Sequence, residues 1–106
     1  MKAYTDLSQS RKLAEILPLE SADMYWDLLS KDKYARVNNI GHCLGRYCVY
    51  AWSLSALLNV LPTFTIDSSD DHYFRIHCQQ KFSEWHDNLI DACYEMVIRL
   101  HKLNLL

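Results

Sequence analysis

Glycine and proline are scarce in this sequence, with two of each among 106 residues. Both glycines, Gly41 and Gly45, lie in one short stretch, which excludes a glycine-rich loop of the kind that binds nucleotide phosphates. Long hydrophobic runs are also lacking, and none approaches the ~20 apolar residues of a membrane-spanning helix. The first residues lack the apolar region of a signal peptide. From these absences we expect a cytoplasmic protein that does not enter a membrane.

An excess of charge is lacking too. The formal net charge is −2 at pH 7, and lysine and arginine are scattered along the chain. Such a chain offers no strong positive field to a polyanion, so we expect no nucleic-acid partner. The four cysteines are predicted to be thiols, because disulfides are rare in the expected compartment. Cys48, Cys78 and Cys93 lie within apolar patterns, where cysteine packs as a small buried residue.

Apolar residues, in contrast, make up half of the chain, enough for one core in a single domain over residues 1–106. A short helix over residues 54–61 is expected at its centre. Ser53 is a suitable N-cap, four leucines share one face of the helix, and Pro62 ends it. Trp52, directly before the cap, is expected to pack on the first turn, and all three tryptophans are expected in the core.

Two longer helices are predicted near the two ends of the sequence. Residues 5–17 form the first, capped by Thr5 or Ser8 and ended by Pro18. Residues 87–103 form the last, and an apolar stripe along it is expected to face the core. The stripe consists of Leu89, Ala92, Cys93, Met96, Val97, Leu100 and Leu103.

Strands are predicted between these helices. Residues 63–67 and 72–79 fit two strands joined by a hairpin turn, and residues 81–85 fit either a third short strand or the approach to the last helix. Residues 47–51 are strand-like as well. Residues 21–29 fit either a strand or a short helix, and their aromatic content favours a strand that pairs with 47–51.

The intervening segment, residues 30–45, is rich in turn formers and is expected to be mostly loop. Helices and strands in this order predict an α+β fold, in which a small, mainly antiparallel sheet packs on about three helices.

A second line of side chains runs along the last predicted helix, apart from its core-facing stripe. It consists of Ile90, Tyr94, Ile98 and His101. Ile98 falls about opposite Leu89, so a helix buried on one side does not explain it. These residues are either ordinary surface positions, positions covered by loops of the same chain, or contacts to another protein. Our hypothesis is that this flank binds a second subunit or a protein partner.

Histidine and cysteine supply zinc ligands in proteins, and four such residues stand out: His42, Cys43, Cys48 and His77. The spacing from Cys43 to Cys48 is not that of a zinc knuckle, and no second close pair accompanies it. Buried or unreactive thiols are therefore the favoured interpretation, and no cofactor is predicted.

Catalytic and calcium-binding patterns are weaker still. His72, His77 and His86 have aspartates near them in the sequence, but no nucleophile elbow or oxyanion nest accompanies them, so the chain is not predicted to be an enzyme. Asp70 and Asp71 lack the ligand pattern of a calcium loop and fit a solvated hairpin turn.

Four stretches of the chain carry a resemblance: TDLSQSRKLAEILP at residues 5–18, SADMY at 21–25, WSLSALLNVLP at 52–62 and DACYEM at 91–96. Together they are similar to small proteins of Bacteroides-type gut bacteria that often lie near prophage or mobile-element genes. The resemblance implies a bacterial protein with a phage connection. It brings no activity, cofactor or catalytic residue with it.

The sequence therefore leaves two hypotheses of different class. The first is a non-enzymatic protein-interaction module in a bacterial cell, either as a homodimer or with an unidentified protein partner. The alternative is a domain that binds a small molecule or a metal through the histidine and cysteine candidates His42, Cys43, Cys48 and His77.

Overall fold

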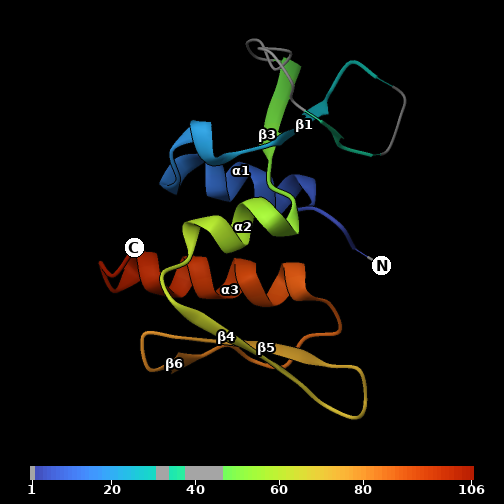
Figure 1. Cartoon of the computed structure of the whole chain (residues 1–106). Coiled ribbons are helices and arrows are strands. Elements are labelled where there is room, and N and C mark those ends of the chain that lie inside the picture. The colour runs from blue at the N-terminus through green and yellow to red at the C-terminus, as the bar shows by residue number, and fades with distance from the viewer. Residues whose placement is uncertain (1, 31–33, 38–46) are drawn as a thin grey trace.

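Helices occupy the middle of the molecule, and a small sheet lies at either end (Figure 1). The computed structural model describes residues 2–30, 34–37 and 47–106, and within these ranges it holds three α-helices and two antiparallel sheets of three strands each. The predicted α+β class is confirmed. A single small sheet was expected. The strands instead form two separate sheets, and the helices lie between them.

The first sheet joins β1 (Met24–Asp27) to β2 (Arg36–Val37) on one side and to β3 (Cys48–Ala51) on the other. The strand interpretation of residues 21–29 and its pairing with 47–51 are confirmed, with Met24 opposite Ala51. β2 is a strand within the segment expected to be mostly loop. Its two residues are too few to show an alternating pattern, so pairing with β1 defines this strand.

The second sheet contains β4 (Phe64–Ser68), β5 (Phe74–Cys78) and β6 (Lys81–Phe82), in that order. The predicted hairpin and the short third strand are both present. Ile76 and Cys78 are buried on the face toward the helices, and alternate residues of β5 point to the opposite face.

Each of the three α-helices in the described part of the chain begins after a residue whose side chain caps its first backbone N–H groups. α1 (Leu7–Ile16) begins after Asp6, whose carboxylate accepts from Gln9 N at 2.8 Å while the Gln9 side chain accepts from Asp6 N at 3.1 Å. The prediction of Thr5 or Ser8 as its cap is wrong, because this reciprocal pair satisfies two N–H groups at once. α2 (Leu54–Val60) begins after Ser53, as predicted. A 3₁₀ turn, η1 (Leu19–Ser21), follows α1.

The longest helix, α3 (Leu89–Lys102), is capped by Asn88 and packs against β5, α2 and α1. Most of its predicted core stripe is confirmed, since Ala92, Cys93, Met96, Val97 and Leu100 have no exposed surface. Leu103, the last member, is 47% exposed because the helix has already ended before it.

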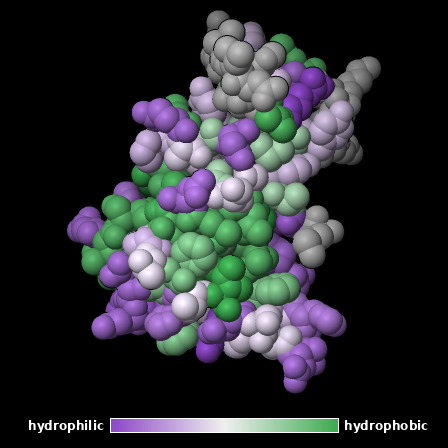
Figure 2. All heavy atoms as spheres, in the orientation of Figure 1, coloured by the Kyte–Doolittle hydropathy of each residue, from purple (hydrophilic) through white to green (hydrophobic). Residues whose placement is uncertain are grey.

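The face of the molecule that Figure 2 shows is mainly hydrophobic in its middle part, over α2 and α3. Residues 51–66, which include α2, contain no Asp, Glu, Lys, Arg or His. Leu54 and Leu58 of α2 are only half-buried. None of the helices in the described part of the chain combines the length and apolar character that crossing a membrane requires.

Candidate functional site

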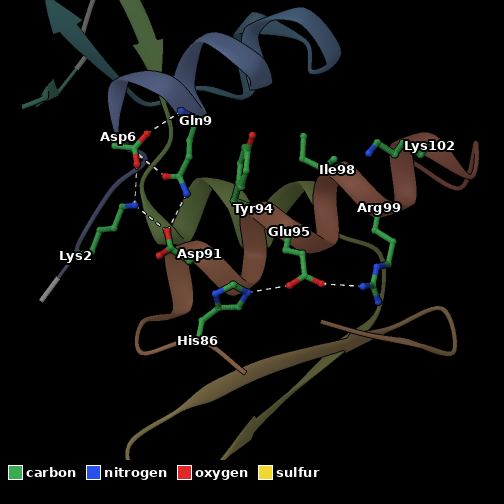
Figure 3. Close-up of a pocket in the computed structure, with 10 residues that line it drawn as sticks. All are labelled: Lys2, Asp6, Gln9, His86, Asp91, Tyr94, Glu95, Ile98, Arg99 and Lys102. Atoms are coloured by element: carbon green, nitrogen blue, oxygen red, sulfur yellow. Dashed lines mark hydrogen bonds and ion pairs between the residues drawn. The ribbon is translucent and has the colours of Figure 1, made fainter. Parts of the chain in front are cut away.

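An open groove of about 580 Å³ follows the outer side of α3 and separates it from the N-terminal part of the chain (Figure 3). Lys2, Asp6 and Gln9 line it from the side of α1. The other wall is formed by His86 and by six residues of α3: Asp91, Tyr94, Glu95, Ile98, Arg99 and Lys102.

Asp91 is the centre of a network at one end of the groove. Its Oδ1 atom accepts hydrogen bonds from Lys2 Nζ at 2.7 Å and from Gln9 Nε2 at 2.8 Å. Its Oδ2 atom accepts from Asn88 Nδ2 at 2.9 Å, while Asn88 Oδ1 accepts from Asp91 N at 2.8 Å. Lys2 also forms an ion pair with Asp6 at 3.2 Å. The network therefore ties the N-terminal residues and the start of α1 to the first turn of α3.

The charges in this network shift each other's pKa. Burial alone would raise the pKa of Asp91, but hydrogen bonds from Lys2, Asn88 and Gln9 outweigh it and lower the pKa to about 2. Burial alone would lower the pKa of Lys2, but the two carboxylates that it contacts raise it. Both groups are held in their charged forms, as expected of a structural ion pair.

We expect the Asp91 carboxylate to stabilise the fold at neutral pH and to stop doing so in acid. Its folded pKa of about 2 lies below the ordinary value of 3.8, so its contribution is complete above about pH 4 and is lost as the pH falls through about 2. The carboxylate is partly exposed, so we expect a contribution of about 1–2 kcal/mol. In urea unfolding, Asp91→Asn should be less stable than the wild type by this amount at neutral pH, and the difference should vanish in strong acid.

The matched control for this prediction is Asp70→Asn, which removes an exposed carboxylate in the β4–β5 turn. It should change the free energy of unfolding by less than about 0.5 kcal/mol at either pH. If Asp91→Asn has wild-type stability at neutral pH, the ion pair does not stabilise the fold.

Glu95 is the centre of a second network, at the side of the groove nearer the second sheet. Its Oε1 atom lies 2.8 Å from His86 Nε2, and its Oε2 atom lies 3.1 Å from Arg99 Nη2. The same carboxylate accepts from Glu84 N at 3.0 and 3.1 Å. Arg99 in turn donates to the backbone oxygen of Phe82. The network therefore holds the segment between β6 and α3 against the helix.

Between the two networks, Tyr94 and Ile98 project from α3 toward α1 (Figure 3). Both are half-buried and pack against the core. Burial raises the pKa of Tyr94, and the negative charge of Asp6 adds to this effect, so the phenol stays neutral. All three carboxylates that line the groove are engaged by cations or N–H groups of the chain itself. The groove therefore offers a neutral centre between charged edges, an arrangement suited to an apolar surface with polar borders.

The structure separates the four residues predicted to bind a partner. Tyr94 and Ile98 lie together in the groove, and His101 is exposed near the end of α3 but does not line it. Ile90 has no exposed surface. Its placement on a partner surface is wrong, because α3 is packed on more than one side and the line of residues begins inside the core.

The metal candidates do not come together among the described residues. His42 and Cys43 lie outside the described ranges. Cys48 takes part in a disulfide, so the prediction of a thiol is wrong for it and it has no free thiolate to bind a metal. His77 stacks on Phe82, with ring centroids 4.2 Å apart. In the described part of the chain, no group of three or more His, Cys, Asp or Glu side chains is arranged to hold a metal ion.

Two other cysteines, Cys78 and Cys93, are free and buried. Burial raises the pKa of both thiols, and that of Cys93 to about 12. Since the thiolate is the nucleophile, neither is suited to react at neutral pH. Both therefore have the role predicted from their apolar surroundings, that of small core residues.

Most residues that line the groove were not singled out from the sequence. Lys2 and Asp91 are 89 positions apart, and no local pattern indicates that they meet. One feature of the sequence could have indicated the charged ends of the groove. The segment that forms α3 has an acidic residue in its first turn and basic residues in its last turn.

Comparisons with protein-family models, with curated proteins and with solved structures gave no match. The resemblance to Bacteroides-type proteins therefore stays a prediction.

Proposed function

We propose that the protein is a non-enzymatic interaction module that pairs with a second copy of itself through the groove along α3. The single observation that supports this most is the position of Tyr94 and Ile98. They are half-buried, adjacent in the groove, and close to the midpoint of α3. In a two-fold symmetric contact, residues at the midpoint of a shared helix lie nearest the axis and meet their own copies.

The distribution of charge along α3 favours an antiparallel partner helix. Asp87 lies just before its start, whereas His101 and Lys102 lie in its last turn, and none of these three residues belongs to the ion pairs of the two networks. A two-fold axis through the middle of the helix places the acidic start of one copy beside the basic end of the other. Unlike charges at both borders, together with opposed helix dipoles, would fix the orientation of the pair. A second copy is thus the occupant whose charges match the groove.

One earlier hypothesis is not carried into this proposal. Metal binding through the histidine and cysteine candidates has lost Cys48 as a ligand.

Light scattering coupled to size exclusion tests the proposal. The wild type should elute with twice the 12.5 kDa mass of the chain, and its dissociation constant should rise with salt. Ile98→Asp places a charge without a partner at the centre of the contact and should weaken dimerisation by about 100-fold. Lys102→Glu reverses an exposed charge at the border and should weaken it by about 10-fold. Circular dichroism confirms that each variant keeps its fold.

Asn59→Arg is the matched control, because it places a charge at an exposed position of α2, one of the two helices over which the hydrophobic area of Figure 2 extends. It should leave the dimer intact. If Asn59→Arg dissociates the dimer and Ile98→Asp does not, the contact lies on α2 and the proposed site is wrong. If the wild type is a monomer at every concentration tested, the proposed function is wrong.

A further inference from the structure

One face of the second sheet points away from α3. Ile76 and Cys78 of β5 are buried toward α3, so Arg75 and His77 point to the opposite, outer face. Tyr73, just before β5, continues this alternation. The segment after β6 runs beside β5 and is joined to it by a bridge between Phe74 and His86. Aromatic residues of this segment therefore lie beside the outer residues of β5.

A stack of side chains holds these aromatic rings in place. The guanidinium of Arg75 lies 4.4 Å from the ring centroid of Phe82 and 4.6 Å from that of Trp85. Asp67 Oδ2 accepts from Arg75 Nε at 2.8 Å and balances its charge. His77 stacks on Phe82. The ion pair of Arg75 and Asp67 thus orients the Trp85 ring from one side. The prediction that Trp85 lies in the core is wrong, because its side chain packs on Arg75 at the surface and is 43% exposed.

Beside Trp85 is an open hollow of about 450 Å³, lined by Ser69, Asp71, Tyr73 and Trp85. The turn that forms its rim is fixed by its own hydrogen bonds. Ser69 N donates to Tyr73 O at 3.0 Å, and Ser69 Oγ accepts from Tyr73 N at 3.2 Å. His72 has a φ of 64°, which closes the turn. Tyr73, at 46% exposure, and Trp85 therefore present ordered rings to the solvent.

We propose that this hollow binds a quaternary ammonium group. The faces of tyrosine and tryptophan rings carry partial negative charge and attract organic cations, and tryptophan does so best. The carboxylate of Asp71 adds a full negative charge, and no cationic side chain lines the hollow. An anion would meet repulsion from Asp71 there. A methylated ammonium fits better than a hydrated one, because its methyl groups can contact the rings with little cost of desolvation.

The hollow and the groove along α3 share no lining residue, so this proposal does not rest on dimerisation. In Figure 1, the β4–β5 turn that forms the rim of the hollow lies at the lower right, at the end of the second sheet away from β6.

A ligand-observed NMR titration tests the proposal with choline and with 3,3-dimethylbutan-1-ol, which has the same shape without the charge. Choline should bind about 10-fold more tightly than the alcohol. Trp85→Leu should weaken choline binding by about 10-fold and Asp71→Asn by about threefold, with little effect on the alcohol. Tyr34→Leu, at an exposed tyrosine away from the hollow, should bind choline as the wild type does.

The same titration distinguishes two sources of the cation. A peptide with a trimethylated lysine that binds at least as tightly as choline, while its unmodified form does not bind, indicates a protein ligand. Binding of choline alone indicates a free metabolite. The proposal is overturned if choline does not bind, if the alcohol binds equally well, or if folded Trp85→Leu and Asp71→Asn both retain wild-type affinity.

Discussion

Replacing Trp52 with alanine is expected to lower the free energy of unfolding by about 3–5 kcal/mol. Its side chain has no exposed surface and lies in the core with Leu13 and Leu57. Its Nε1 atom donates to Ser21 Oγ at 2.9 Å, which adds a polar contact to the buried ring. The truncation would leave a cavity in this core and would remove one of the two hydrogen bonds of the Ser21 hydroxyl, which still donates to Pro18 O. Urea unfolding followed by circular dichroism measures the loss.

Two other tryptophan variants make this result specific. Trp52→Phe keeps a buried ring but removes the hydrogen bond to Ser21, so it should cost about 1–2 kcal/mol. Trp85→Ala removes an exposed ring and should cost less than about 1 kcal/mol. If the alanine variants at both positions lose similar stability, Trp52 is not the centre of the core.

Local patterns in the sequence predict the helices well. The N-cap at Ser53, the spacing of the leucines and the stop at Pro62 all lie within ten positions, and α2 forms where they indicate. Five successive members of the α3 stripe are fully buried for the same reason, because helical periodicity is a property of neighbouring residues.

The errors occur where distant residues decide the outcome. Thr5 is a good capping residue by type, but its hydroxyl accepts instead from Trp52 N, 47 positions away, and Asp6 caps α1. Ile90 is on the predicted outer flank of α3, yet a packed neighbour covers it. Whether the strands form one sheet or two depends on pairing between segments, which alternation within a strand does not encode.

The candidate site was predictable only in part, for the same physical reason. Tyr94 and Ile98 were identified because they break the one-sided pattern of α3. The side chains that surround them, such as Lys2 and Gln9, come from the other end of the chain. Trp85 was expected in the core because of its residue type, whereas its cation–π contact with Arg75 supports it at the surface.

A buried pair of hydroxyl groups carries the second large effect that we expect. Thr5 Oγ1 lies 2.7 Å from Ser10 Oγ and accepts from Trp52 N at 3.1 Å, and both residues are fully buried. Thr5→Val keeps the shape but leaves the Trp52 N–H and the Ser10 hydroxyl without this partner. Because an unsatisfied buried polar group costs its full desolvation penalty, we expect a loss of about 1–3 kcal/mol in the free energy of unfolding.

Thr65→Val is the matched control, since Thr65 is exposed on β4 and should tolerate the change within about 0.5 kcal/mol. A double-mutant cycle with Ser10→Ala should show coupling, because the two hydroxyls share one hydrogen bond. Equal effects of Thr5→Val and Thr65→Val would contradict the prediction. Thr5 N also donates to Trp52 O at 2.9 Å, so these bonds fix the segment that carries Lys2 and Asp6. In Thr5→Val, the position of Lys2 and Asp6 in the groove would therefore be less fixed. We expect the affinity of the proposed dimer to fall together with the free energy of unfolding.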